Sequence, residues 1–446
     1  MSQPEMDTTL SQTSTTPLRL YNSLTRCVEA FRPHQQPVTV YVCGITPYNT
    51  THLGHLFTYA TADTLMRYLE YSGWPVTYVQ NLTDVDNAIL REAQAQDEFW
   101  RDLGNRWTRH FMHDMQALNI WAPHHYPRAT EVIPEIIANV RELVAAGLAY
   151  ISQGTVYFHV PAWPAYGQLS QLSRQEMLSR ARDNGFDSQD ASKRDALDFP
   201  LWRAQQPGEP AWDSPWGSGR PGCHIECSTM ASHFLGEMVD MHIGGSDLLF
   251  PHHESELAQA EGATGVRPFV RYWMHVGMVQ LEGEKMSKSR RNLVMVRDLL
   301  QRHSADTLRL YLAMHHYRQS WSYDAAALHE SEEMYKTVRE AAQVPSGPRT
   351  AAALEVDDWR RELRDSMDDD LQTPRAVAAM VKLATAIRTA SRERCNIDNA
   401  QRLLREFGQL FGLRLHHGEP EERVRLGWDT HLARLQLARL QLARLQ

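Results

Sequence analysis

The sequence predicts an α/β protein with a parallel β-sheet, an insertion between the two halves of the sheet domain and a helical C-terminal region. Val38-Thr-Val-Tyr-Val-Cys43 is an apolar, β-branched run that ends at Gly44 and precedes a helical pattern over residues 58–71. A second strand-like run, residues 76–80, follows that pattern. A strand, a helix and a strand at such short spacing form a βαβ unit, which makes the two strands parallel neighbours in one sheet.

Length and charge limit the class of protein. A chain of 446 residues is too long for one hydrophobic core and predicts about two to four domains. No apolar run approaches the roughly 20 residues that cross a bilayer, so we expect no membrane partner. The formal net charge of -8 argues against coating of nucleic acid by general basic charge, but it permits a local basic patch.

Cellular location is predicted from the N-terminus and the cysteines. Residues 1–17 are polar and rich in Ser and Thr, so we expect a disordered leader and not a secretory signal. The five cysteines show no paired spacing typical of a disulfide framework. Both observations predict a cytoplasmic protein.

Further along the chain, helical patterns cover residues 86–118 and 131–145, and strand-like runs return at 238–242 and 269–274. The segment between them is rich in Pro, Gly and Trp and lacks sustained periodicity. The predicted divisions are a leader at 1–17, the first half of the sheet domain at 18–152, a connective insertion at 153–221, the second half at 222–295, a helical contact region at 296–345, a helical bundle at 346–415 and a tail at 416–446.

The tail contains three identical copies of Leu-Ala-Arg-Leu-Gln, from Leu432 to Gln446. A five-residue period matches neither 3.6 nor 3.5, so it cannot keep one apolar seam on a helix. We interpret it as a repeat expansion without function. The alternative is an arginine-bearing helix that contacts RNA or a partner.

The first chemical motif is His52-Leu-Gly-His55, between the first strand and the following helix. A helix N-terminus offers unpaired N–H groups, and Gly54 lets a phosphate approach the backbone closely. Two histidines there can stabilise negative charge on an α-phosphate under attack. Alone, this short motif is more often structural than catalytic.

The second motif is Lys285-Met-Ser-Lys-Ser289, which follows Gly277 and Gly283. Two lysines, Lys285 and Lys288, on a loop suit the transient clamping of a pyrophosphate leaving group. Alone, it is equally compatible with a solvated basic loop. In this order and at this separation the two motifs resemble the two signatures of class I aminoacyl-tRNA synthetases, which implies a Rossmann-like catalytic sheet.

A third group of residues has metal-ligand chemistry. His252 and Glu256 are four apart and share a face if helical. Cys43 ends the first strand, and Cys227 lies in Gly222-Cys-His-Ile-Glu-Cys-Ser228. Two thiolates, an imidazole and a carboxylate make a tetrahedral zinc site. Spacing alone does not reveal this set, and it favours buried apolar thiols at both cysteines.

Residues 18–330 resemble the cysteinyl-tRNA synthetase family. The stretches that carry the resemblance include Tyr41-Val-Cys-Gly44, Asn81-Leu-Thr-Asp-Val-Asp86, His224-Ile-Glu-Cys-Ser228, Gly244-Gly-Ser-Asp247 and Phe250-Pro-His-His-Glu254. The resemblance implies an ATP-dependent cysteine–tRNA ligase that uses Mg²⁺ with ATP and is a monomer. In this family zinc binds the substrate thiolate, and the implied ligands are Cys43, Cys227, His252 and Glu256.

The resemblance also implies roles for other residues. His52, His55, Lys285 and Lys288 are the implied catalytic residues. The implied nucleotide-binding residues are Gly44, Thr46, Thr58, Asn81, Thr83, Gly245, Ser246, Asp247, Val279 and Lys288. Zinc favours a soft thiolate over a hydroxyl, so serine can be rejected without an editing domain.

Departures from the family concern the pocket and the acceptor. Cys223 stands where the family usually has Trp; it either enlarges the pocket, or competes for zinc or senses oxidation.

Cys43-Gly-Ile-Thr-Pro-Tyr48 also resembles the mycothiol-pathway ligase, which joins cysteine to the amine of glucosaminyl-inositol. Glu256 favours tRNA(Cys) as the acceptor, because that ligase generally lacks a ligand there, and the amino sugar is the alternative. A non-catalytic paralogue or a plain nucleotidyltransferase explains the complete residue set less well.

Overall fold

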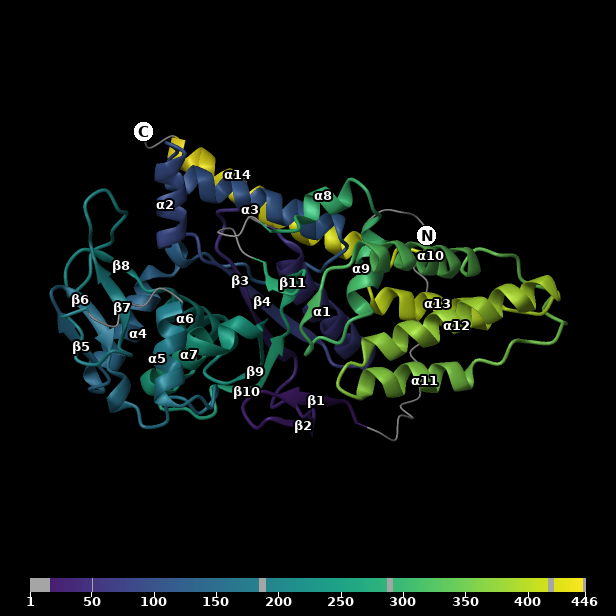
Figure 1. Ribbon diagram of the computed structural model, residues 1–446, viewed down its shortest axis with the longest axis horizontal. Helices are drawn as coiled ribbons and strands as arrows, with labels where there is room; N and C mark the ends of the chain where they lie inside the picture. Colours follow the sequence, from purple (N-terminus) through teal and green to yellow (C-terminus); the bar gives the residue numbers. More distant parts are fainter. Residues whose placement is uncertain (1–16, 50, 184–189, 287–291, 416–420, 444–446) are drawn as a thin grey trace, which may run out of the picture.

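The computed structural model describes residues 17–443 except 50, 184–189, 287–291 and 416–420, and side chains are described up to residue 437 (Figure 1). The predicted leader therefore lies almost wholly outside the described residues. None of the described helices is long and apolar enough to span a membrane.

A four-stranded parallel sheet forms the centre of the molecule, in the order β10-β9-β3-β4. Its strands are β3 (Val38–Ile45), β4 (Val76–Leu82), β9 (Val239–Gly245) and β10 (Val270–Val276). Nearly every residue of β3 is buried, because helices cover both faces of a parallel sheet. The carboxyl ends of β3 and β9 meet at one edge of the sheet. The α/β class with a parallel sheet is thus confirmed.

Helices pack around this sheet, and several begin at side-chain caps. For example, the Asp86 carboxylate accepts the Ala88 N–H at 2.7 Å and caps the helix that follows β4. The helices and single turns are α1 (Leu53–Tyr71), α2 (Asn87–Ala95), α3 (Trp100–Ala117), η1 (Ala129–Glu131), α4 (Ile133–Ala145), α6 (Cys223–Leu235), η3 (Ser246–Leu248), η4 (Leu249–His253) and α7 (Glu254–Thr264).

The insertion is an antiparallel sheet with a short helix, on the left of Figure 1. Its elements are β5 (Ala149–Ser152), β6 (Thr155–Phe158), η2 (Val160–Ala162), α5 (Arg174–Asp183), β7 (Phe199–Ala204) and β8 (Gly219–Pro221). Its first strand begins at Ala149, slightly ahead of the predicted boundary at 153. The end of β8 leads directly into α6, so the insertion positions the start of that helix.

The remaining strands lie beside the core. A hairpin of β1 (Arg19–Asn22) and β2 (Cys27–Ala30) precedes the central sheet, and β11 (Val279–Leu281), β12 (Glu284–Lys285) and β13 (Trp321–Ser322) form a small separate sheet. The helices of the C-terminal half are α8 (Val296–Leu300), α9 (Ala305–Ala313), α10 (Ala325–Ala341), α11 (Asp357–Asp368), α12 (Thr373–Arg392) and α13 (Asp398–Leu410). The helices α10 to α13 form a bundle on the right of Figure 1.

The last helix, α14 (Glu422–Ala443), crosses back along α3 and not along the bundle (Figure 1). It starts ten residues ahead of the repeat at Leu432. Val424 and Trp428 are fully buried, and the Trp428 indole donates to the Ile120 carbonyl at 2.8 Å. The described part of the predicted tail up to Leu435 is therefore packed on the sheet domain.

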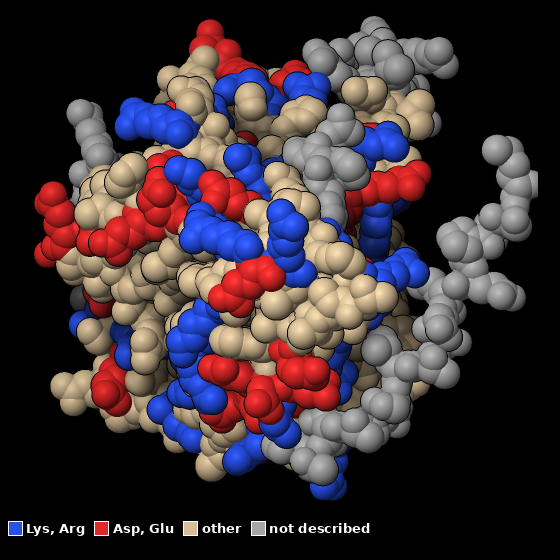
Figure 2. Space-filling model, turned by 90° about the vertical axis from the view of Figure 1, so that its right-hand side faces the viewer, with Lys and Arg blue, Asp and Glu red and all other residues tan. Residues whose placement is uncertain are grey.

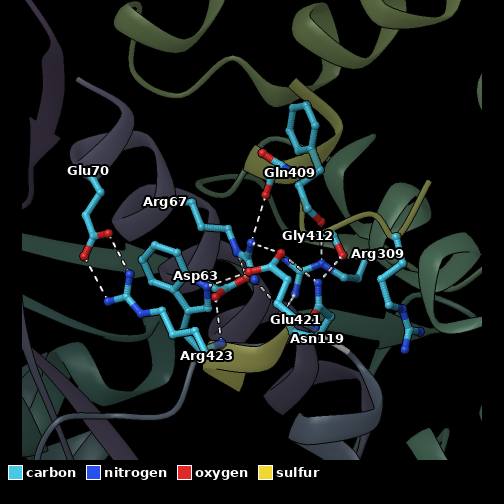
Figure 3. A network of polar contacts seen from close by, with 12 residues as sticks. Asp63, Arg67, Glu70, Asn119, Arg309, Gln409, Gly412, Glu421 and Arg423 are labelled. Atoms are coloured by element: carbon cyan, nitrogen blue, oxygen red, sulfur yellow. Dashed lines mark hydrogen bonds and ion pairs between the residues drawn. The ribbon is translucent and has the colours of Figure 1, made fainter. Parts of the chain in front are cut away.

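A buried polar network fixes this arrangement (Figure 3). Asp63 on α1 accepts hydrogen bonds from Arg67 and Arg309. Arg67 also pairs with Glu421 at 2.7 Å, just before α14. Burial opposes ionisation of Asp63, but Arg67 and Arg309 outweigh it and lower its pKa. Residues far apart in sequence are thus joined in one ion-paired cluster.

The surface of the helical end carries both signs of charge. Figure 2 shows basic and acidic side chains interspersed there, without one large field of either sign. Ion pairs contribute to this mixture, such as Arg360 with Glu406 at 3.1 Å and Arg388 with Glu340 at 3.2 Å. This pattern fits the modest net charge of -8.

Candidate active site

The candidate site lies at the carboxyl edge of the central sheet, where β3 and β9 end. Cys43 and Gly44 are at the end of β3, and Gly245 ends β9. The loop after β3 leads into α1, and the turn after β9 leads through η3 and η4 into α7. Ligands of open parallel sheets bind at this edge.

His52 is the N-cap of α1. Its Nδ1 accepts the backbone N–H groups of Gly54 at 3.1 Å and His55 at 3.4 Å. Its proton therefore sits on Nε2. Burial lowers the pKa of His52 to about 4, against the smaller opposing effect of Asp247. At neutral pH His52 is a neutral imidazole with one N–H to donate.

His55 lies against His52 in the first turn of α1. The two rings stack with centroids 3.7 Å apart. Burial, and then the neighbouring His52, hold the pKa of His55 well below its ordinary value. Its Nδ1 is buried and has no hydrogen-bond partner in the structure. The pair is thus a neutral double imidazole beside the helix N-terminus.

The two sequence motifs are joined by backbone hydrogen bonds. Leu53 donates to the Val294 carbonyl and Val296 donates to the Thr51 carbonyl, each at 2.9 Å. His52 and Met295 form a bridge between these two bonds. The chain that leaves the lysine-rich loop is therefore fixed to the chain that enters α1.

Lys285, the first lysine of the second motif, is exposed on β12 and lies 3.3 Å from Asp247. Asn292 donates to the Lys285 carbonyl at 3.2 Å. The second predicted lysine, Lys288, lies outside the described residues. Lys285 and Asp247 both lie close enough to His52 to affect its pKa. Asp247 raises this pKa and Lys285 lowers it.

The predicted nucleotide-binding residues that the structure describes lie on β3, α1, β4, β9, η3 and β11 or directly after these elements, and Lys288 lies outside the described residues. The Gly44 N–H donates to the Asn81 side chain at 2.7 Å, and a Cβ on Gly44 would lie 1.6 Å from the Asn81 carbonyl oxygen. Only glycine therefore fits at this position. Asn81 in turn donates to Thr83 at 3.2 Å. Thr58 donates weakly to the Gly54 carbonyl, Ser246 and Asp247 form η3, Thr46 follows β3, and Val279 is buried in β11.

The four predicted metal ligands converge although they come from different elements. The ligand atoms of Cys43, Cys227, His252 and Glu256 all lie within 4.8 Å of one another. The Cys43 Sγ is 3.7 Å from Glu256 Oε1, and His252 Nε2 is 2.9 Å from the same oxygen. All are buried except His252, which is partly exposed.

The ionisable groups of this cluster have pKa values shifted in different directions. Burial raises the pKa of Cys43, whereas the hydrogen bond from Cys43 lowers that of Cys227. Burial opposes ionisation of Glu256, but His242 and His252 outweigh it and lower its pKa. His242 and His252 thus favour the anionic form of Glu256, whereas the pKa values of the two cysteines are shifted in opposite directions.

The structure also places a second set around the same atoms. His242 and His253 lie 3.4 Å and 3.3 Å from Cys43 Sγ, so Cys43, His242, His253 and Glu256 are a further possible ligand group. Every member of that set is buried. A catalytic metal needs an open position, which favours the set containing the partly exposed His252.

The sequence analysis did not assign His242, His253, His275 or Glu226 to the site. His253 hydrogen-bonds His275 at 2.8 Å, and His275 bonds Ser23 at 2.7 Å. The His252-His253 doublet was the signal, but only one member was assigned. Glu226 is fully buried with both carboxylate oxygens unpaired, and no pattern in the sequence indicates it.

Comparison with known families assigns both parts of the molecule. Residues 30–333 match the tRNA synthetases class I (C) catalytic domain. The chain belongs to the class I cysteinyl-tRNA synthetase family. Residues 362–416, within the helical bundle, match the DALR domain. The predicted helical domain after the Rossmann-like domain is confirmed.

Curated cysteine–tRNA ligases are similar over most of this chain. That of Dehalococcoides mccartyi is 40% identical over 405 residues, covering 90% of this chain and 88% of the relative. Those of Alkalilimnicola ehrlichii and Halorhodospira halophila are 42% and 43% identical, covering 92% and 89% of this chain and 88% and 85% of theirs. These matches confirm the prediction of a cysteine–tRNA ligase over the amino-sugar ligase.

Solved structures show the same fold at low identity. A Mycobacterium tuberculosis methionyl-tRNA synthetase with methionyl-adenylate has a TM-score of 0.60 at 16% identity, covering 84% of this chain and 89% of that one. A leucyl-tRNA synthetase ternary complex from Agrobacterium radiobacter has a TM-score of 0.59 at 11% identity, covering 86% and 85%. They support the class I synthetase fold alone.

Proposed function

We propose that the protein activates L-cysteine with ATP at a zinc site and transfers it to tRNA(Cys). The observation that carries the proposal is the convergence of four ligand residues at the carboxyl edge of the central sheet, where β3 and β9 end. These residues are Cys43, Cys227, His252 and Glu256. Tetrahedral zinc separates neighbouring sulfur, nitrogen and oxygen ligands by about 3.3 to 3.6 Å. The 2.9 Å and 3.7 Å separations in this group match that spacing after small side-chain shifts.

The ligand chemistry supports cysteine as the amino acid. Bound zinc supplies a Lewis acid that prefers a substrate thiolate to a hydroxyl. Cys43 and Cys227 would hold it from β3 and α6, and His252 and Glu256 from either side of the start of α7. The partly exposed His252 leaves the amino acid a way in. The substrate carboxylate is then free to reach the phosphate region near His52.

Neutral donors would bind the ATP phosphates. His52 presents Nε2–H, because its Nδ1 is occupied by two backbone donors and its pKa is about 4. Gly44 leaves no side chain between the backbone and the nucleotide. ATP would bind as its Mg²⁺ complex. Lys285, together with Lys288 of the same motif, would stabilise the pyrophosphate as it leaves. We assign no general base to activation, because a carboxylate is already an anion at neutral pH.

Transfer to tRNA completes the proposed reaction. The terminal ribose hydroxyl of tRNA(Cys) would attack the adenylate carbonyl and release AMP. The DALR match in the bundle supports an RNA acceptor. We further propose that the enzyme acts as a monomer in the cytoplasm, which sedimentation and cell fractionation would test.

One experiment tests the acceptor directly. Labelled cysteine and ATP are incubated with the protein, matched total tRNA and glucosaminyl-inositol together. We expect label in alkali-labile, acid-precipitable RNA. Label confined to the small-molecule fraction would overturn the tRNA assignment.

A second experiment tests the zinc assignment. Cys227→Ser should lose bound zinc and cysteine-dependent ATP–pyrophosphate exchange together, because a hydroxyl is a poor zinc ligand. Cys395→Ser, in the helical part of the chain, is the matched control and should keep both. Stoichiometric zinc with normal exchange in Cys227→Ser would remove this residue from the site.

A further inference from the structure

A second cluster of ligand atoms lies on the other side of His252. The structure brings Cys223, His224 and His252 within 4.8 Å of one another. Cys223 Sγ is 3.6 Å from His224 Nδ1, and His224 Nδ1 is 2.7 Å from His252 Nδ1. The two nitrogens of His252 therefore face two different ligand groups, since its Nε2 lies 2.9 Å from Glu256.

The geometry is that of a metal site. Neighbouring ligands of tetrahedral zinc lie about 3.5 Å apart for sulfur and nitrogen and about 3.3 Å apart for two nitrogens. The separation of Cys223 from His224 already has this value. The two imidazoles need to move apart by roughly half an ångström, which small ring rotations provide.

We propose that Cys223, His224 and His252 bind a second Zn²⁺, with His252 bridging the two ions as an imidazolate. The Cys223 thiol proton and the remaining His252 ring proton pass to solvent when the second ion binds. A thiolate with two imidazoles is a ligand set that zinc prefers over magnesium or calcium. Three protein ligands leave the fourth position open to water or to the amino acid. Because the second ion would share His252 with the first, its binding is expected to slow cysteine activation.

Charges near the cluster set the strength of this second site. Arg203 is partly buried and lies close enough to Cys223 to interact with it, so it opposes a bound cation. The buried carboxyl group of Glu226 also lies near Cys223, one helical turn along α6. With one ligand fewer than the first set and Arg203 nearby, the second ion binds more weakly than the first.

Metal titration of the zinc-loaded enzyme tests the proposal. The protein is loaded with one equivalent of Zn²⁺, and Co²⁺ is added while thiolate-to-cobalt charge-transfer absorption is recorded. We expect a second equivalent to bind with this band in the wild type. In Cys223→Ser the band should disappear and the second affinity should fall at least about tenfold.

Controls separate this site from the first. Cys395→Ser should bind both equivalents, and Cys223→Ala, checked for folding by circular dichroism, should repeat the Cys223→Ser result. Inhibition of ATP–pyrophosphate exchange by excess Zn²⁺ should weaken in both Cys223 variants. One equivalent only in the wild type, or a second equivalent that persists with its band in Cys223→Ser, would overturn the proposal. The first zinc assignment is tested separately. If it is wrong, Cys227→Ser retains the tightly bound equivalent of zinc, as the wild type does.

Discussion

We propose that His52 performs two tasks with one side chain. Its Nδ1 caps α1 through the Gly54 and His55 N–H groups, and its Nε2 is left to donate to the nucleotide. The capping task is structural and the donating task is chemical. A substitution that preserves one and removes the other can separate them.

His52→Asn is that substitution. Asn is among the best N-cap residues, so the free energy of unfolding should stay within about 0.5 kcal/mol of wild type. Cysteine activation should fall about 10² to 10³-fold, because a donor to the transition state is lost. His52→Ala is the companion variant and should lose the same activity and about 1 kcal/mol of stability. Denaturation in urea and pyrophosphate exchange measure the two effects, and unchanged exchange in His52→Asn would contradict the donor role.

His275 links pH to stability. Burial, and then His242, lower its pKa to about 3 in the folded protein, whereas an unfolded chain takes up that proton near pH 6.5. Between these values the unfolded state binds more protons, so the free energy of unfolding falls as the pH falls below 6.5.

His275→Asn should reduce this loss. Each buried neutral histidine contributes up to about 1.4 kcal/mol per pH unit in that window. Urea unfolding at pH 7.5 and 5.5 should therefore show a smaller difference for His275→Asn than for wild type. His113→Asn, on the exposed surface of α3, should leave the difference unchanged. Equal slopes for His275→Asn and wild type would show that His275 titrates normally.

The candidate site could be only partly predicted from single residues. The proximity of His252 and Glu256 could be predicted, because a helix brings residues four apart onto one face. The proximity of Cys43 and Cys227 could not be predicted from their spacing in the sequence. The pairing of β3 with β9 and the packing of α6 bring these two residues together. The resemblance supplied what local periodicity lacked.

At the scale of elements, α14 is the clearest difference between pattern and structure. The five-residue repeat dominates the sequence of the tail and predicts one uniform segment over residues 416–446. Val424, Trp428, His431 and Leu435 are all buried and spaced by four, three and four residues, which is an ordinary helical stripe. Most of that stripe precedes the repeat. A search for the stripe alone would have found the docked helix.

Truncation tests this division of α14. Removing residues 437–446 should leave the melting temperature and cysteine activation unchanged, since the last buried residue described is Leu435. Removing residues 421–446 deletes Trp428 and Glu421, so stability should fall by several kcal/mol, comparable to about 3 to 5 for one buried aromatic. Equal stability of the two truncations would show that the docked half contributes nothing.

At the scale of the whole molecule, the cluster around Asp63 couples parts distant in sequence. Asp63 and Arg67 on α1 meet Arg309 on α9 and Glu421 ahead of α14 (Figure 3). Arg309 also donates to the Phe411 carbonyl at the end of α13. We infer that the sheet domain, α9 and the start of α14 unfold together.

Asp63→Asn tests this coupling. Removing the carboxylate leaves two buried guanidinium groups with less compensation, which costs about 3 to 5 kcal/mol. Asp369→Asn is the control, because its pair with Arg375 is exposed and contributes at most about 1 kcal/mol. Unfolding followed by tryptophan fluorescence and by circular dichroism should give one shared transition, shifted only in Asp63→Asn. Separate transitions for the two probes in wild type would contradict the coupling.

The docked half of α14 has a genetic consequence. On an α-helix a five-residue repeat advances by about 140° beyond a full turn per copy, so such a repeat does not maintain one buried face. Only the first copy supplies a described buried leucine, Leu435, to the body of the protein. A change in copy number by replication slippage adds or removes whole codons and leaves the contacts up to Leu435 intact. The number of copies beyond Leu435 is therefore expected to be neutral for the folding of the described part of the chain.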